Sequence, residues 1–254
     1  MIKPCVSLEH TEKLSRVKNT IVLKIYGANA MKNNFDKYNY KNFNRIDGET
    51  RVYDLGKTKV PSVTTILKAT QPEEKTESLK KWQERVGKKK ADQIRDDAAA
   101  LGTALHKCLE KYILNNGDLK YFDDTSLGRR ARKMANIIIG RAFFNLDEVW
   151  GCEVHLAGEN YAGTTDAVGI FDGQPAIIDF KQTNKPKREE WIEDYYLQLT
   201  AYAMAHNYTF GTHLSQGYIL MCSRDGYFQQ FHLTPDMFPM YSEKWKKRLE
   251  AYYG

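Results

Sequence analysis

The residues of this chain with the clearest chemical potential are an aspartate and a lysine near its centre. Asp179 and Lys181 lie two apart at the end of the apolar segment 176–180, so a strand there would place both side chains on one face. Burying a carboxylate or an ammonium costs free energy unless the group is paired or bound to a metal. An Asp-x-Lys pattern alone is common, and it is also compatible with a structural ion pair at a strand end.

A predicted hairpin brings a second carboxylate, that of Asp166, to the same place. Asp172-Gly173 is a strong two-residue turn signal between the apolar segments 163–171 and 175–181. A hairpin centred on this turn places Asp166 nearly opposite Asp179, with Cβ atoms about 5 Å apart. Two carboxylates at that separation favour a bound cation over one protonated aspartate. Oxygen ligands of this type suit Mg²⁺ or Mn²⁺.

Two predicted helices offer further polar groups. His106 and Glu110 lie four apart on a helix over residues 101–114, so His106 can act as a further ligand, or Glu110 can support it from one turn away. Gln198 and Tyr202 share one face of a second helix in the same way. Taken singly, each pattern is also that of an ordinary amphipathic helix.

The elements that must position these residues follow from the hydrophobic periodicity and the turn signals. The pattern predicts helices over residues 77–115, 129–147, 189–207 and 235–253, and a short Ser- or Thr-capped helix within 61–67. It predicts strands over residues 52–55, 152–156, 161–171, 175–180, 218–222 and 227–233. This order of helices, a three-stranded meander, a helix, a hairpin and a helix indicates an α/β fold with a mixed sheet and flanking helices.

Composition narrows the class of protein. With 42% hydrophobic and 28% charged residues over 254 positions, the chain has the make-up of a soluble globular protein. Its apolar runs are too short for a membrane-spanning helix, and the first twenty residues lack the apolar core of a signal peptide. The four cysteines, at positions 5, 108, 152 and 222, form no CxxC pair, which argues against a disulfide framework, a zinc site or an iron–sulfur site.

Charge is concentrated in one segment. The net charge is +6, and residues 75–95 hold eight basic side chains against three acidic ones, with Trp82 among them. Such a run is either a solvated helix face or a surface that binds phosphates and stacks a base. Residues 1–50 are polar and irregular, and Asn29–Asn44 is predicted to be a loop-rich arm.

The joint order of these motifs resembles the RecB-like branch of the PD-(D/E)XK nuclease superfamily. The resemblance covers roughly residues 51–233 and is carried by Gly102, His106, Asp166, Asp179, Lys181, Gln198 and Tyr202. Within that branch, Pro61–Leu67 and Asp179–Thr183 resemble the mitochondrial genome maintenance exonuclease family and its phage-encoded relatives. One departure is Thr165 before Asp166, where many superfamily members have proline.

The resemblance implies a fold and an activity. The fold would be a restriction-endonuclease-like mixed central sheet flanked by helices, with a polar extension over residues 1–50 and a single nuclease domain over 51–254, whose helical DNA-binding part covers about 67–148. The activity would be that of a metal-dependent DNA exonuclease preferring single strands, free ends or flaps, in recombination, repair, replication or degradation. A structure-specific endonuclease and an inert DNA-binding module are the alternatives, and the inert module is disfavoured because Asp166, Asp179 and Lys181 are all present.

The resemblance also implies roles for individual residues. His106, Asp166, Asp179 and the Phe180 carbonyl would bind Mg²⁺ or Mn²⁺, and Lys181 would orient or deprotonate the attacking water or neutralise charge. The supporting residues would be Glu110, Glu153, Gln198 and Tyr202. The DNA contacts would come from Trp82, Arg85, Lys88, Lys89, Lys90, Lys185 and Lys187. No iron–sulfur cluster is expected, because only Cys222 follows the Gln198 motif, and a cytoplasmic location, with a phage-encoded protein acting in its host, is expected.

Overall fold

The computed structural model describes residues 31–118 and 123–254 of the chain. The predictions made for the first twenty residues and for Cys5 therefore lie outside the described residues. Among the residues described, no helix has both the length and the apolar character needed to cross a bilayer. Cys108, Cys152 and Cys222 are free thiols, as expected.

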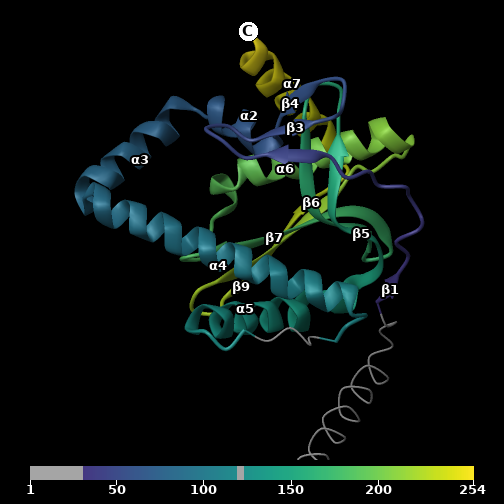
Figure 1. Ribbon diagram of the computed structural model, residues 1–254, viewed down its shortest axis with the longest axis horizontal. Helices are drawn as coiled ribbons and strands as arrows, with labels where there is room; N and C mark the ends of the chain where they lie inside the picture. Colours follow the sequence, from purple (N-terminus) through teal and green to yellow (C-terminus); the bar gives the residue numbers. More distant parts are fainter. Residues whose placement is uncertain (1–30, 119–122) are drawn as a thin grey trace, which may run out of the picture.

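A six-stranded mixed sheet forms the centre of the molecule (Figure 1). Its strands, in spatial order, are β1 (Lys32–Asn33), β5 (Leu146–Ala157), β6 (Ala162–Phe171), β7 (Gln174–Thr183), β8 (Gly217–Ser223) and β9 (Phe228–Leu233). The strands β5, β6 and β7 form an antiparallel meander, β7 and β8 run parallel, and β9 returns antiparallel to β8. The predicted mixed α/β fold is confirmed.

The β6–β7 hairpin has the predicted register. Asp172 and Gly173 have φ angles of 52° and 72°, which a two-residue turn of the primed type requires. Ala167 pairs with Ile178, so the next position along brings Asp166 beside Asp179, as the turn signal indicated. The backbone N–H of Phe180 donates a hydrogen bond of 2.6 Å to Asp166 Oδ2, which ties the two strands together at this point.

Helices cover both faces of the sheet. They are α2 (Val63–Ala69), α3 (Glu73–Val86), α4 (Lys88–Leu114), α5 (Ser126–Ala142), α6 (Glu193–Phe210) and α7 (Phe238–Tyr253), with single 3-10 turns at Phe143–Asn145 and Glu189–Trp191. One face packs against α4 and α5 and the other against α2, α6 and α7. Alternation along β7 serves both layers, because Ile178 and Phe180 enter the first cluster and Ile177 enters the second. Each such side chain contributes roughly 1.5–3 kcal/mol on burial.

Two helical predictions need correction. The helix predicted over 77–115 is interrupted at Gly87, whose φ of 85° is incompatible with a continuous helix, and this separates α3 from α4. Helix α3 has no buried residue and stands away from the sheet in Figure 1. The helix predicted over 129–147 ends at Ala142, because Leu146 and Val149 are buried as part of the long strand β5.

A second, three-stranded sheet lies against the first. It consists of β2 (Asn44–Ile46), β3 (Val52–Asp54) and β4 (Lys59–Pro61). Tyr53 anchors it, since its side chain is 1% exposed and its hydroxyl lies 2.8 Å from Thr164 Oγ1 on β6. The Phe43 N–H also donates to His155 Nδ1 at 2.9 Å. The described part of the polar extension thus contributes strands to both sheets, and a separate domain over residues 51–254 stays a prediction.

Candidate active site

The predicted site residues converge on one cavity of about 180 Å³. It lies between α4, α6, the strands β5 to β7 and the small sheet, because residues from each of these elements line it. The predicted residues in its wall are His106, Glu153, Asp166, Asp179, Lys181, Gln198 and Tyr202. Glu110 lines an adjoining groove that shares His106, Glu153 and Lys181 with the cavity.

His106 is held by hydrogen bonds on both ring nitrogens. Its Nε2 lies 2.8 Å from the Phe180 carbonyl oxygen, and its Nδ1 lies 3.2 Å from Asp166 Oδ1. Helix α4 can present the imidazole in this way because Leu105 and Leu109, on the neighbouring face of the helix, are fully buried against the sheet. The Phe180 carbonyl, expected as a metal ligand, thus lies against the imidazole. It accepts a hydrogen bond when Nε2 carries a proton.

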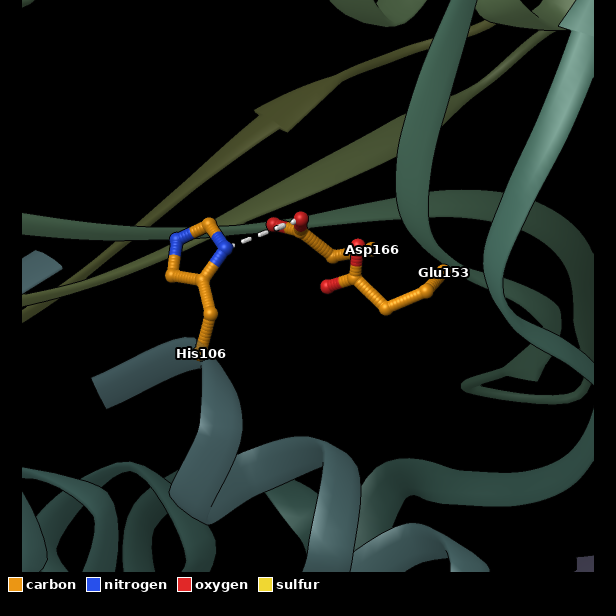
Figure 2. Close-up of side chains that lie close together, drawn as sticks. All are labelled: His106, Glu153 and Asp166. Atoms are coloured by element: carbon orange, nitrogen blue, oxygen red, sulfur yellow. Dashed lines mark ion pairs between the residues drawn. The ribbon is translucent and has the colours of Figure 1, made fainter. Parts of the chain in front are cut away.

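Glu153 completes a group of three possible metal ligands. One ligand atom from each of His106, Glu153 and Asp166 lies within 4.8 Å of the other two, and Figure 2 shows the imidazole reaching from its helix toward the two carboxylates on the strands. Cys152 pairs with Ala167 and Val154 with Thr165, so Glu153 falls opposite Asp166 in the β5–β6 ladder. The resemblance implied only a supporting role for Glu153, whereas the geometry places it among the candidate ligands.

The backbone at Glu153 is unusual for a residue within a strand. Its φ angle is 53°, in the left-handed region that side chains with a Cβ rarely adopt. Such a conformation costs about 1–3 kcal/mol and persists only where the surrounding structure imposes it. Here the long strand β5 holds the residue between regular pairs on either side, and the carboxylate enters the cavity.

Asp179 and Lys181 form an ion pair in the cavity. Asp179 is 2% exposed, and its Oδ2 contacts Lys181 Nζ. The ammonium also lies 5.3 Å from the centre of the Tyr195 ring, at a distance typical of a cation–π contact. Phe180 points to the opposite side of β7, into the apolar cluster beneath α4 and α5, as predicted.

Burial has the largest influence on the pKa of each carboxyl group here. It raises the pKa of Glu153 to about 7, with a further contribution from Asp166, and it raises the pKa of Asp179 to about 6 although Lys181 opposes it. Burial acts on Asp166 in the same direction, but His106 overcomes it and the pKa of Asp166 lies below its ordinary value. For His106 burial lowers the pKa, yet Asp166 raises it on balance to about 9. The positive charges of His106 and Lys181 thus offset only part of the burial and mutual repulsion of the three carboxyl groups.

Gln198 and Tyr202 form the wall contributed by α6. Gln198 Nε2 donates a hydrogen bond of 3.1 Å to the Tyr202 hydroxyl, and both side chains are buried. A Cβ atom at Gly163 would approach Tyr202 Cε1 to 2.6 Å, so this tyrosine can lie against β6 only because position 163 is glycine. The glycine that precedes Asp166 by three residues is therefore required for steric reasons.

The predicted DNA-binding residues lie away from the cavity. The structure places Lys88, Lys89 and Lys90 on the exposed first turn of α4 and Arg85 on the exposed end of α3, while Trp82 is half-buried. Lys185 is exposed and Lys187 half-buried after β7, and neither is among the residues that line the cavity. In the same basic segment, Lys75 pairs with Asp194 at 2.9 Å and so has a structural partner.

Sequence reasoning missed the wall contributed by the small sheet. Arg45, Arg51 and Tyr53 line the cavity, together with Thr164 of β6. A signal for this wall was present, because Asp47-Gly48 is a hairpin turn signal of the same kind as Asp172-Gly173. The signal is weak, because exposed Asn44 and Arg45 precede the turn and exposed Glu49 and Thr50 follow it.

The mixed sheet flanked by helices, with acidic, lysine and histidine side chains around one cavity, is similar to what the resemblance to the PD-(D/E)XK nucleases implied. The chain is 30% identical over 207 residues to mitochondrial genome maintenance exonuclease 1 of Xenopus tropicalis. The matched segment covers 76% of this chain and 57% of the relative. It is 26% identical over 210 residues to the protein of that name from Homo sapiens, covering 78% of this chain and 59% of the relative. The expected resemblance to this family is confirmed.

Other comparisons add context. The chain spans about three fifths of the length of the curated relatives it matches. A solved structure of a candidate exonuclease from Eubacterium rectale is 13% identical, with a TM-score of 0.41 over 61% of this chain and 68% of that one. No protein-family model matches the chain.

Proposed function

We propose that this protein is a metal-dependent deoxyribonuclease that removes nucleotides from free ends, with a preference for single-stranded DNA or flaps. The observation that carries the proposal is the convergence of two sets of groups in one cavity. His106, Glu153 and Asp166 offer ligand atoms within 4.8 Å of one another, and the ion pair of buried Asp179 with half-buried Lys181 opens onto the same space. Hydrolysis of a phosphodiester needs both a cation and a positioned proton donor or acceptor.

The donor set fits Mg²⁺ or Mn²⁺. Carboxylate oxygens with one imidazole suit these ions better than softer metals. A hydrogen bond from His106 Nε2 to the Phe180 carbonyl would fix the ring with Nδ1 toward Asp166, the arrangement in which an outer partner orients a metal-ligating histidine. We therefore propose His106, Asp166 and Glu153 as ligands, with Asp179 next to them and the Phe180 carbonyl orienting the imidazole. When bound, the ion supplies an activated water and stabilises negative charge on the phosphate.

The protein groups perform the remaining tasks. Lys181, held by Asp179 on one side and the Tyr195 ring on the other, presents an ammonium to the cavity, where it would donate a hydrogen bond to the water or to a phosphate oxygen. The Gln198–Tyr202 pair would keep the wall of α6 fixed behind these groups.

Four substrates test the proposal. Linear single-stranded, circular single-stranded, linear duplex and flapped DNA are each incubated with Mg²⁺, Mn²⁺ or a chelator. Metal-dependent loss of the linear but not the circular single strand is expected. Cleavage of the circle would instead indicate an endonuclease. Binding without cleavage of any substrate in the presence of either metal would indicate an inert DNA-binding module.

A pair of variants with the same chemical change provides the control. Asp179→Asn removes a carboxylate in the cavity, whereas Asp172→Asn makes the same change at an exposed turn position whose φ of 52° asparagine tolerates. Asp179→Asn is expected to abolish cleavage and Asp172→Asn to leave it intact. Equal activity of the two variants would contradict the proposed site.

A further inference from the structure

Two arginines of the small sheet project to the mouth of the cavity. Arg45 pairs with Tyr53 across the β2–β3 ladder, so the two side chains share a face of that sheet. Arg51 lies two residues before Tyr53 and therefore points to the same side. All three line the cavity. The register thus directs two guanidinium groups toward the proposed metal ligands from a sheet that contributes none of those ligands.

One carboxylate holds both guanidinium groups in place. Asp47 Oδ1 accepts a hydrogen bond of 2.7 Å from Arg51 Nε, and its Oδ2 accepts one of 3.0 Å from Arg45 Nε. Asp47 therefore occupies the Nε edge of each arginine. A guanidinium has five N–H donors, and the outer donors of Arg51 have no acceptor among the described residues, while one Arg45 Nη lies 2.9 Å from Asp47. Several donors remain for a ligand.

The backbone that carries Arg51 is also fixed. Its carbonyl accepts hydrogen bonds of 2.9 Å from Ser62 N and from Thr65 Oγ1, and its N–H donates to Thr65 Oγ1 at 3.2 Å. Ser62 in turn caps helix α2, whose apolar residues are in the core. The side chain of Arg51 is thus mounted on a rigid base, which lowers the entropic cost of holding a ligand.

The arginines are not direct ion-pair partners of the cavity carboxylates, although the charge of Arg45 opposes the rise in the pKa of Glu153 from a distance. Within the described residues, neither forms an ion pair or hydrogen bond with Glu153, Asp166 or Asp179. Both side chains also remain 41–44% exposed. A purely structural role would predict direct pairing with the acids and deeper burial.

The arginines also line a groove that leads away from the cavity. The groove has a volume of about 810 Å³, and its wall includes Lys111 of α4 and Gln182 of β7. It shares Arg45, Arg51 and Lys181 with the cavity, so the two spaces adjoin. A ligand that passes from the groove into the cavity must run beside both guanidinium groups.

We propose that Arg45 and Arg51 form a phosphate clamp, a pair of guanidinium groups that binds the backbone phosphate next to the scissile one and positions the strand. The proposal rests on the proposed function, because it takes the ligand to be a nucleic acid strand entering the metal-binding cavity. Arginine suits this task since its planar fork gives bidentate, charge-assisted hydrogen bonds to phosphate oxygens. Contacts of this kind set register on the strand without reading its sequence.

The test measures binding separately from cleavage. In a Lys181→Ala background, Arg45→Ala/Arg51→Ala is compared with Lys57→Ala/Lys59→Ala, which removes the same charge from exposed positions of the β3–β4 turn and strand. Affinity for a fluorescent linear single-stranded oligonucleotide is measured by anisotropy across a range of salt concentrations. The arginine variant is expected to bind at least about tenfold more weakly and to reduce the salt slope by about 0.7, the contribution of one lost single-strand phosphate contact. The lysine variant is expected to change little.

Three outcomes would overturn the clamp. These are equal loss of affinity in both double variants, no loss in either, or loss of Mn²⁺ binding by calorimetry in the arginine variant, which would assign the arginines to the metal centre. With Lys181 intact, Arg51→Lys is expected to raise KM several-fold with kcat nearly kept. A wild-type protein that binds Mn²⁺ but cleaves no DNA would contradict the proposed function instead, and the binding comparison would still decide the clamp.

Discussion

The β6–β7 hairpin carries carboxylates inside the folded core, whereas the β2–β3 hairpin carries guanidinium groups at the surface. Asp166 and Asp179 are 6% and 2% exposed. They lie on β6 and β7, each of which pairs with another strand on both of its sides. A slip of one residue there would move every side chain of a strand to the other face, so burial fixes the register. Arg45 and Arg51 depend instead on a small sheet anchored by a few long-range hydrogen bonds.

The contrast separates two tasks. Groups that take part in chemistry need a fixed, partly dehydrated setting, which the central sheet provides. Groups that receive a strand need access to solvent, which the small sheet provides because Arg45 and Arg51 remain partly exposed on it. Variants in the first hairpin should therefore act on the rate of cleavage, and variants in the second should act on binding.

The largest effect is expected for Lys181→Ala. Loss of a half-buried, pre-positioned ammonium should lower the single-turnover cleavage rate about 1,000-fold, while affinity for single-stranded DNA stays within a few fold. Lys57→Ala, which removes an exposed lysine, serves as the control. Residual activity within tenfold of wild type would remove Lys181 from the mechanism. It would also contradict the assignment of catalysis to the β6–β7 hairpin and of binding to the β2–β3 hairpin.

A second large effect is expected for Glu153→Gln. If Glu153 is a ligand, its amide should weaken Mn²⁺ binding by at least about tenfold, as measured by titration calorimetry. Glu110→Gln provides the matched control, because Glu110 lines only the adjoining groove. Unchanged affinity in Glu153→Gln would return the ligands to the set that the resemblance implied, which is His106, Asp166, Asp179 and the Phe180 carbonyl.

The response to pH should reverse when metal is added. The folded pKa of Glu153, about 7, exceeds its ordinary value of 4.5, so the folded state binds more protons and the metal-free protein should lose stability as pH rises through 4.5–7. His106, raised to about 9, stabilises fully below 6.5 and loses that contribution as pH rises through 9. The melting temperature of the metal-free protein should therefore fall between pH 5 and 9, by about 2–4 °C per kcal/mol.

Metal binding has the opposite pH dependence, because ligands must lose protons before they coordinate. Affinity for Mn²⁺ should rise between pH 6 and 8. Glu153→Gln should flatten the lower part of the metal-free melting curve. A metal-free melting temperature that increased with pH over this range would contradict the assigned pKa directions.

A moderate effect is expected at the basic start of α4. Replacing Lys88, Lys89 and Lys90 by alanine should weaken DNA binding and reduce the salt slope by at most about 2, with cleavage of saturating substrate unchanged. Lys41, Lys57 and Lys59, all exposed, form the matched triple variant. An unchanged slope would identify the first turn of α4 as an ordinary solvated surface and leave strand binding to the groove.

The smallest effect is expected for Tyr53→Phe. Loss of the hydrogen bond to Thr164 should destabilise the protein by about 1 kcal/mol, measured by urea unfolding, and should raise KM more than it lowers kcat. Tyr161→Phe, which loses a hydrogen bond of 2.9 Å to the Ala201 carbonyl within the core, is the control and should change stability alone. A kcat defect in Tyr53→Phe would show that the small sheet also positions the reacting groups.

The same contrast explains how much could be predicted from the sequence. The β6–β7 hairpin was predictable to the residue, because a turn that demands positive φ and two buried apolar strands leave one register. The two faces of β7 and the buried face of α4 followed from periodicity for the same reason. The residue roles assigned by resemblance stay predictions.

The small sheet was not predictable in this way. The strand at Val52–Asp54 was predicted, but the strands Asn44–Ile46 and Lys59–Pro61 begin with exposed polar residues and were not. The docking of this sheet depends on contacts such as Tyr53 with Thr164, 111 positions apart. The position of Glu153 among the candidate ligands could not be predicted either. A φ of 53° within a strand follows from tertiary constraint and not from local preference. Gly87, by contrast, offered a local signal for the break between α3 and α4.

The backbone at Glu153 has a consequence for anyone who evolves or designs this protein. Glycine adopts that φ without steric cost, so Glu153→Gly would relieve strain while removing a candidate ligand. A selection for heat resistance alone would thus favour glycine at the position where function favours glutamate. Under the proposed function, variants recovered from such a selection would be stable and inactive. A substitution at residue 153 is the first change to look for in them.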